Sequence, residues 1–496
     1  MVVQKNKMMK KLILGVLSMM LFSCAKDKGN YDYTEVNKVT VTLKDSTFVM
    51  QQLQELVISP ILTESMPNSG DAYTYEWSVY PTVSDPGMSG VKVEEPKPVL
   101  LSEEKDLKSV ITLSPNDYFL QYTITNKKTA LKTIKRYLLS VKGAFYEGWI
   151  IMSNVADKGQ LSFIRKDNQS FLNPISQING FELEGKGLKA YSGVIDYMSA
   201  VYVFTDKKSY RFDADDFNLK ASEGDMFIDK LKFTDPYYSI NSINTDQYII
   251  NDGSVYATIS PYFGTPGKFS SPFGGEDVSL FPYFFAGGSR IYNSFYDNKH
   301  KRFVFADYNS RVLRPFTPIA GAPYDVSNVG KTMIAADLGM NKTYYTIMRD
   351  DQGYYFYGFN PNVASPADLY QPVKNSPDID KATGFAASSS LQHLYYSTER
   401  AIYLYDILAN SSRKVYEFAI GKKIKDIKMY KSKGYGTFTD PLFNKRLVVA
   451  TNDASNGEVF YFDLAPTGDI AGNTFVQSFS GFGDIVQLNY RNPNEK

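Results

Sequence analysis

The feature that most constrains the fold is a hairpin-like unit that recurs through the last two thirds of the chain. Each copy has an apolar strand, a polar turn and an aromatic-rich strand. The seven copies start at Trp149, Val201, Gln247, Lys301, Tyr344, His393 and Arg446. Their spacing averages about 50 residues, which is typical of the four-stranded blades of a β-propeller. We therefore predict a seven-bladed β-propeller over residues 146–490.

The copies are degenerate, so six or eight blades also fit the sequence. A pair of further β-sandwiches would account for the strands but not for their regular spacing. In each case the fold class is all-β. Aromatic residues make up 15% of the chain, Tyr and Phe favour strands, and helical periodicity is scarce beyond the first residues.

Residues 36–142, before the repeat, show the pattern of an immunoglobulin-like β-sandwich, with short strands separated by turns. We predict strands at Val39–Leu43, Glu55–Leu62, Tyr73–Tyr80, Tyr118–Asn126 and Ile134–Val141, the last two as a pair. In YTYEWSVY, alternation places Tyr73, Tyr75, Trp77 and Val79 on one face. Trp77 is predicted to be the core tryptophan, and a tryptophan in a binding groove is the alternative. The domain boundary is placed near Gly143.

Residues 1–23 have the three parts of a bacterial export signal. Several lysines precede an apolar run, Leu12–Phe22, which leads to the only cysteine of the chain, Cys24. Leu21-Phe22-Ser23-Cys24 resembles a lipobox, so we predict cleavage before Cys24, a lipid on its thiol and a tether over residues 24–35. The alternative is an ordinary secretory peptide cleaved elsewhere. A membrane-spanning helix is disfavoured because it needs about 20 apolar residues.

The stretch CAKDKGNYDYTEVNKVTV, from Cys24, resembles the start of the mature chain in the PKD-like lipoprotein family of Bacteroidota. The segment YEGWIIMSN, from Tyr146, is similar to that family's entry into its second domain. The resemblance implies a PKD-like sandwich and a lipid anchor in the outer membrane, at the cell surface. It also implies residence beside SusC/SusD-type uptake systems, with those transporter proteins as partners. It names no agreed ligand and no catalytic residues.

Charge and residue content narrow the functional classes. Lys plus Arg number 54 and Asp plus Glu number 53, so the chain lacks the basic excess expected of a nucleic-acid-binding protein. It has two histidines and contains no HExxH, CxxC or Gly-x-Ser-x-Gly pattern. We predict no metal and no cofactor. Clustered carboxylates at Asp213–Asp216 suggest calcium, but they lack the spacing of a calcium loop, so a solvated turn is favoured.

These observations favour a non-catalytic binding or accessory protein of a nutrient-uptake system, with a glycan or a peptide as ligand. The alternative is a hydrolase that acts on carbohydrates or peptides from the propeller. Glycosidases need only two carboxylates, so the scarcity of histidine does not exclude one.

The Gly- and Pro-rich segment Pro261–Gly288 carries eight Tyr and Phe residues. Loops normally lie at the surface, where so many aromatic side chains would be costly unless they contact a ligand or partner. Contact residues are predicted at Tyr262, Phe263, Phe269 and Phe273. The alternative is that the segment packs between two blades. Within it, LFPYFF is expected to be core and PYFGTPGKF to be exposed.

Overall fold

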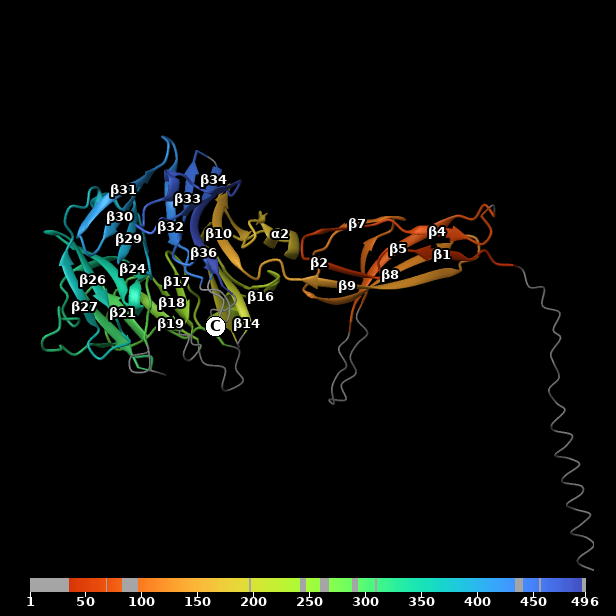
Figure 1. Cartoon of the computed structure of the whole chain (residues 1–496). Helices are drawn as coiled ribbons and strands as arrows, with labels where there is room; N and C mark the ends of the chain where they lie inside the picture. The colour runs from red at the N-terminus through yellow and green to blue at the C-terminus, as the bar shows by residue number, and fades with distance from the viewer. Residues whose placement is uncertain are drawn as a thin grey trace, which may run out of the picture.

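The computed structural model describes residues 35–492, apart from 68, 83–96, 196–197, 241–246, 259–266, 288–292, 308–309, 433–439 and 455. Cys24, Tyr262 and Phe263 lie outside the described residues. The described chain is built mainly of strands and forms two parts that lie side by side (Figure 1). A β-sandwich comes first, and a ring of sheets follows it.

The sandwich packs two layers around Trp77. The larger sheet has the order β2 (Thr47–Gln51), β9 (Lys132–Lys142), β8 (Asn116–Asn126), β5 (Tyr73–Pro81) and β6 (Val99–Ser102). Against it pack β1 (Val39–Thr42) paired with β4 (Ile61–Glu64), and β3 (Glu55–Ile58) paired with β7 (Leu107–Val110). Trp77 is fully buried and stacks on Tyr122 with ring centroids 4.1 Å apart. The prediction of a core tryptophan is therefore confirmed.

One predicted strand of the sandwich is in fact two. The stretch Glu55–Leu62 divides at Ser59 and Pro60, so that β3 pairs with β7 while β4 pairs with β1. Proline has no N–H to donate to a sheet, which favours a break at this point. The predicted closing pair is confirmed, because β8 and β9 pair antiparallel along most of their length.

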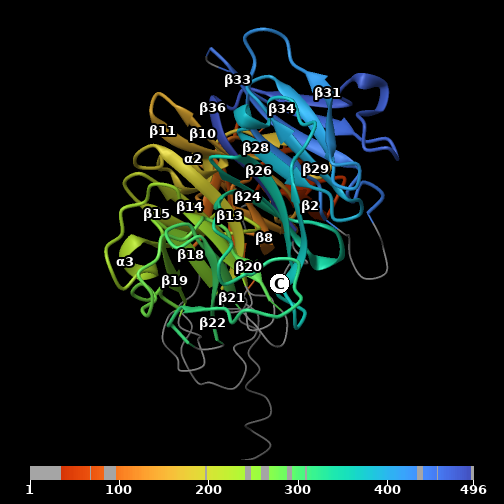
Figure 2. The ribbon, with the colours of Figure 1, turned by 90° about the vertical axis from the view of Figure 1, so that its left-hand side faces the viewer.

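The second part is a β-propeller, since its described strands form seven successive sheets around an axis. In Figure 2, strands β13, β24 and β28 lie toward the middle, while β19, β22 and β31 lie near the edge. The first blade runs outward from the axis as β36 (Asp484–Arg491), β10 (Gly148–Val155), β11 (Lys158–Arg165) and β12 (Ser170–Phe171). Because β36 pairs with β10, strands from both ends of the propeller share one blade and close the ring.

The other blades run outward from the axis in chain order. Blade 2 is β13 (Gly187–Ile195), β14 (Met198–Thr205), β15 (Ser209–Asp213) and β16 (Leu219–Ser222). Blade 3 is β17 (Tyr237–Ile240), β18 (Gln247–Asn251) and β19 (Ser254–Ala257), and blade 4 is β20 (Phe285–Ala286), β21 (Asn293–Asp297), β22 (Arg302–Ala306) and β23 (Arg314–Pro315). Blade 5 is β24 (Thr332–Leu338), β25 (Tyr344–Asp350), β26 (Gly353–Phe359) and β27 (Ala367–Pro372). Blade 6 is β28 (Gly384–Ala387), β29 (His393–Ser397), β30 (Ala401–Asp406) and β31 (Ser411–Glu417), and blade 7 is β32 (Lys423–Met429), β33 (Arg446–Asp453), β34 (Asn456–Asp463) and β35 (Gln477–Ser480).

Helices play a small part in the fold. Those in the described residues are α2 (Pro174–Asn179), α3 (Glu223–Met226) and the 3-10 turns η2 (Met340–Lys342), η3 (Ile379–Lys381) and η4 (Ala471–Asn473). Within the described ranges, none of the helices is long and apolar enough to cross a membrane.

The recurring sequence unit corresponds to the second and third strands of a blade in every copy but one. The copy placed at Lys301 is wrong by one strand, because the residues after it form β22 and β23. The second strand of that blade is β21, and its turn to β22 spans residues 298–301. Asn293 and Ser294 of β21 are polar although buried, so this strand lacks the apolar pattern that marks the others.

Asparagine side chains join neighbouring blades. Oδ1 of Asn154 in β10 accepts the N–H of Gly187 in β13 at 2.8 Å, and its Nδ2 donates to the Gly187 carbonyl at 3.2 Å. Asn298 makes the same pair of bonds to Met333 of β24, and Asn452 of β33 makes it to Ile485 of β36. Each asparagine thus satisfies both backbone groups of one residue in the next blade's inner strand.

The sandwich contacts the propeller near blade 2. A Cβ at Gly143 would lie 2.8 Å from the Asp215 carbonyl oxygen, so the connection between the two parts requires a glycine here. Asn218 Nδ2 donates to Ser114 Oγ of the sandwich at 2.9 Å. Leu53 of the sandwich packs against the core cluster of blades 1 and 2.

Candidate functional site

Inner strands from around the ring border one cavity on the propeller axis, with a volume of about 490 Å³. We call it the axial channel. Its lining comes from β13, β17, the segment before β20, β24, β28, β32 and β36, so every blade contributes. The volume falls within the range of about 300–1,000 Å³ that ligand pockets occupy.

Aromatic side chains line part of the axial channel. Tyr237 of β17 and Tyr283 have ring centroids 5.3 Å apart, and Tyr191 of β13 lies 5.8 Å from Tyr237. Phe281 and Phe385 add two half-buried rings. Burial raises the pKa of Tyr237 and Tyr283, so both phenols stay protonated at neutral pH. Such half-buried faces can stack on the ring of a ligand.

Asp337 of β24 is held by three partners. Its Oδ1 accepts the N–H of Leu338 at 2.8 Å, and its Oδ2 accepts the N–H of Ala387 in the next blade at 2.8 Å. Lys431 Nζ also lies 2.8 Å from Oδ2. These bonds fix the carboxylate against the wall and join blade 5 to blade 6.

Asp426 of β32 is held in the same way. Its two oxygens accept the N–H groups of Ile427 and of Leu488 in β36, both at 2.8 Å. Lys428 Nζ lies 3.2 Å from Oδ1. Burial lowers the pKa of Lys428, but the carboxylates of Asp426 and Asp337 outweigh this effect and raise the pKa overall, so the ammonium stays charged.

Two amides of β36 point their oxygens at blade 2. Gln487 Oε1 accepts the N–H of Ala190 at 2.7 Å, and Asn489 Oδ1 accepts the N–H of Ser192 at 3.0 Å. Because a side-chain amide carries its oxygen and nitrogen on opposite sides, these bonds also fix the orientation of the N–H2 groups. Both residues line the axial channel.

Two further lysines line the axial channel and pair with exposed carboxylates. Lys189 Nζ lies 3.2 Å from Asp235, whose side chain is 64% exposed. Lys425 Nζ lies 3.5 Å from Asp484, whose side chain is 53% exposed. Ion pairs of this exposed kind contribute little free energy, so either lysine can exchange its partner for a ligand.

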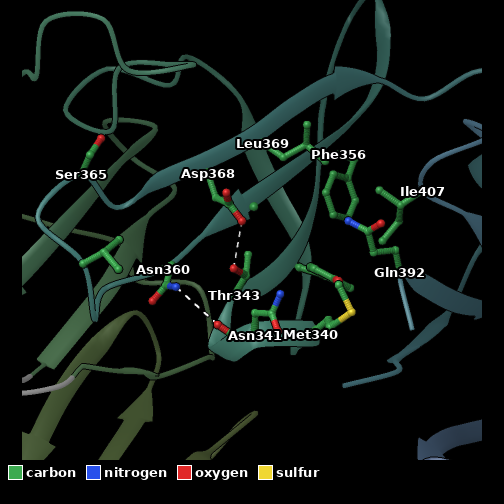
Figure 3. Close-up of a pocket in the computed structure, with 13 residues that line it drawn as sticks. Met340, Asn341, Thr343, Phe356, Asn360, Ser365, Asp368, Leu369, Gln392 and Ile407 are labelled. Atoms are coloured by element: carbon green, nitrogen blue, oxygen red, sulfur yellow. Dashed lines mark hydrogen bonds between the residues drawn. The ribbon is translucent and has the colours of Figure 1, made fainter. Parts of the chain in front are cut away.

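Figure 3 shows a smaller hollow of about 260 Å³ in blade 5, beside blade 6. Thr343 Oγ1 donates to Asp368 Oδ2 at 2.9 Å, and Asn360 Nδ2 lies 3.5 Å from the Asn341 carbonyl oxygen. The fully buried side chain of Phe356 lines one side of this hollow. These polar contacts of the hollow join its own residues, whereas charged side chains from several blades line the axial channel, so the axial channel is the stronger candidate.

The structure corrects one predicted contact residue. Phe269 is 1% exposed and stacks on Phe227 with ring centroids 5.1 Å apart. Its backbone bridges to Phe227 and Thr258, which draws the chain into the core between blades 2 and 3. The prediction of an exposed contact at Phe269 is therefore wrong. Phe273 is half-buried against the core of blades 3 and 4, and Tyr262 and Phe263 lie outside the described residues.

The other half of that aromatic segment is divided between core and channel. Leu280, Phe284 and Phe285 are buried, as predicted for LFPYFF. Phe281 and Tyr283 instead reach the axial channel. No residue of the axial channel was predicted as a site. The available signal was polar side chains within the inner-strand sequences KIKDIKM and DIVQLNYR.

The carboxylates at Asp213–Asp216 form a turn. Asp213 Oδ1 accepts the N–H of Asp215 at 2.9 Å, and Asp216 Oδ1 accepts that of Asn218 at 2.8 Å. Asp215 also pairs with the buried guanidinium of Arg491 in β36. Among the residues that the structure describes, no cluster of His, Cys, Asp or Glu is arranged to hold a metal ion.

Comparison with known proteins identifies part of the chain. Residues 24–187 match the PKD-like family. This PKD-like region starts at Cys24, covers the sandwich and continues through the outer strands of blade 1 to the first residue of β13. No curated protein matches the chain.

Solved structures with a similar course of the chain include propeller proteins. A quinonprotein alcohol dehydrogenase-like protein from Bacteroides thetaiotaomicron shares 14% identity with a TM-score of 0.49, over 91% of this chain and 99% of that one. The β-propeller domain of Myceliophteria thermophila Cps50 (Swd1) shares 9% identity with a TM-score of 0.40, over 65% of this chain and 98% of that domain. At this identity they say nothing of function, and the propeller assignment rests on the sheet order.

Proposed function

We propose that the protein is a non-catalytic binding protein that holds a nutrient ligand, a glycan or a peptide, in the axial channel. The observation that carries this proposal is the convergence of aromatic rings and hydrogen-bond donors from the inner strands on one cavity of about 490 Å³. Binding pockets combine this kind of apolar surface with a few fixed polar groups, which set the orientation of the ligand.

The geometry of the channel carboxylates favours binding over hydrolysis. A glycosidase needs two carboxyl groups free to reach the scissile bond, one of them able to hold a proton. Both oxygens of Asp337 and both oxygens of Asp426 already accept backbone N–H groups. These bonds hold each carboxylate against the wall, which suits a structural role.

We further propose that the protein acts at the cell surface, anchored in the outer membrane through a lipid on Cys24. The export-signal pattern of residues 1–23 supports this, as does a PKD-like match that begins at the cysteine. The sandwich would then separate the propeller from the membrane. The propeller would present its ligand to a SusC/SusD-type transporter.

The binding proposal is tested by screening oligosaccharides and peptides against the full chain in detergent and then comparing two variants. Phe385→Ala removes a half-buried ring from the axial channel, and Tyr370→Ala removes a ring that is 40% exposed on the outer strand β27. Phe385→Ala should weaken binding by roughly tenfold or more, as expected for an aromatic anchor. Tyr370→Ala should leave it unchanged. Equal affinities for both variants, with unchanged melting temperatures, would place the ligand elsewhere.

A further inference from the structure

We infer that the ligand of the axial channel is an acidic saccharide, an oligosaccharide of the uronic acid type whose rings carry carboxylate groups. This inference rests on the binding function proposed above and names its ligand class. It follows from which hydrogen-bonding groups of the channel wall are already used and which are not.

Four side chains of the axial channel already accept hydrogen bonds from the propeller itself. The carboxylates of Asp337 and Asp426 each accept two backbone N–H groups. The side-chain oxygens of Gln487 and Asn489 each accept one from blade 2. The bonds from Leu338 and Ile427 lie within one strand, and the other four reach inner-strand N–H groups of the adjacent blade. A ligand that relied on donating to these oxygens would compete with the bonds that join the blades.

The donors of the axial channel remain available. An ammonium group has three N–H donors, and Lys428 has one carboxylate contact, to Asp426 at 3.2 Å. Its side chain is 41% exposed, so the group meets the channel. Lys189 and Lys425 hold exposed carboxylates at 3.2 and 3.5 Å. The N–H2 group of Asn489 is turned away from blade 2 because its oxygen is fixed there. The channel therefore offers donors, three of them cationic, to a ligand rich in acceptors.

An anionic ligand makes the best use of this arrangement. A carboxylate accepts charge-assisted hydrogen bonds, which are roughly twice as strong as neutral ones. The rings of Tyr237, Tyr283 and Phe385 lie in the same cavity and can stack on sugar rings. Carboxylates and rings together indicate a uronate oligosaccharide.

The hydrogen-bonding groups of the channel wall also disfavour an acidic peptide as the ligand. A peptide carries an N–H donor at almost every residue, and each needs an acceptor when it is removed from water. The side-chain oxygens of Asp337, Asp426, Gln487 and Asn489 already accept backbone N–H groups, so a peptide N–H would have to share an oxygen with one of these bonds. A sugar hydroxyl both donates and accepts and can bond to a neighbouring sugar, so it tolerates a wall of donors.

The test measures the affinity of the full chain, in detergent, for short oligomers of galacturonate, glucuronate and mannuronate by isothermal titration. The matched neutral ligands are the same oligomers with their carboxylates methyl-esterified. The channel variants are Lys428→Gln and the conservative Lys428→Arg. The control is Lys414→Gln, which removes an exposed lysine that pairs with Glu417 on the outer strand β31.

At least one uronate oligomer should bind, and its methyl ester should bind at least tenfold more weakly. Lys428→Gln should weaken uronate binding by about tenfold, the loss expected for one charge-assisted hydrogen bond. It should leave the ester unaffected. Lys428→Arg should stay within about threefold of the native affinity, and Lys414→Gln should match it.

Two results would overturn the ligand class alone. One is an ester that binds as tightly as the acid, and the other is an acidic peptide that binds more tightly than every uronate. In both cases the binding function stands if Phe385→Ala still weakens the interaction. If no saccharide or peptide binds in a manner that Phe385→Ala weakens, the inference and the proposed function both fail.

Discussion

Asn154→Ala should lower the stability of the propeller measurably, although Asn154 is not among the residues that line the axial channel. The asparagine is 6% exposed and holds both backbone groups of Gly187, at 2.8 Å to the N–H and 3.2 Å to the carbonyl. Alanine keeps the strand but removes both partners. The N–H and carbonyl of an inner strand would then lack partners at the junction of blades 1 and 2.

The size of the expected loss in unfolding free energy follows from the packing around Gly187. A Cβ there would lie 2.0 Å from Met152 Cε and 3.1 Å from Gly159 Cα, so little room exists for water to replace the amide. A buried polar group left without a hydrogen bond costs about 1–3 kcal/mol of stability. The hydrogen bond to the Gly187 carbonyl is the longer of the two, at 3.2 Å, so its loss should cost an amount near the low end of this range. We therefore expect Asn154→Ala to lower the free energy of unfolding by about 2–4 kcal/mol.

The assay is urea unfolding of the full chain followed by tryptophan fluorescence, with hydrogen exchange used to locate the change. The two tryptophans report on different parts, because Trp149 lies in β10 and Trp77 in the sandwich. Exchange should increase in peptides from β10 and β13 and stay unchanged in the sandwich. The control, Asn362→Ala, removes an exposed loop asparagine and should have little effect.

A loss of unfolding free energy below about 0.5 kcal/mol, with native exchange in β13, would refute this role of Asn154, because unpaired backbone groups in an inner strand must cost more than that. An equal loss in Asn362→Ala would also contradict it. That result would show that the effect is not specific to the contact between blades.

Four further predictions concern a buried ring, a histidine, the lipidated cysteine and the domain boundary. Phe269→Ala should lower the free energy of unfolding by roughly 3–5 kcal/mol in urea titration, because the ring is buried between blades 2 and 3; an exposed ring would cost almost nothing. Desolvation lowers the pKa of His393, so the folded state binds fewer protons than the unfolded state below about pH 6.5, and stability should fall as the pH drops. His393→Gln should lose less stability than the native chain between pH 7 and pH 5, and parallel losses would contradict this cause. Cys24→Ala should abolish the incorporation of labelled fatty acid in cells, and continued labelling would show that the lipid is elsewhere. A fragment that starts at Phe145 should unfold cooperatively by itself, whereas a molten fragment would show that the sandwich is needed to complete the core.

Much of the architecture could be predicted because strands and turns are local properties. Alternation in YTYEWSVY placed Trp77 in the sandwich core, where it is fully buried. The recurring hairpin pattern predicts two strands of nearly every blade, because the second strand of a blade is apolar and the turn that follows it is polar. Strand β21 lacks this pattern, because its buried residues Asn293 and Ser294 are polar.

The sequence by itself therefore determined an all-β chain with a sandwich and a ring of repeated hairpins. Only the tertiary structure decided where the site lies. Lys428, Asn489 and Tyr237 belong to three different blades, and they meet because β36 pairs with β10 and closes the ring. Tertiary packing also decided that Phe269 is buried, since a Gly- and Pro-rich segment has no periodicity that could assign a side chain to the core or to solvent. Both outcomes depend on contacts between residues distant in sequence, which no local pattern encodes.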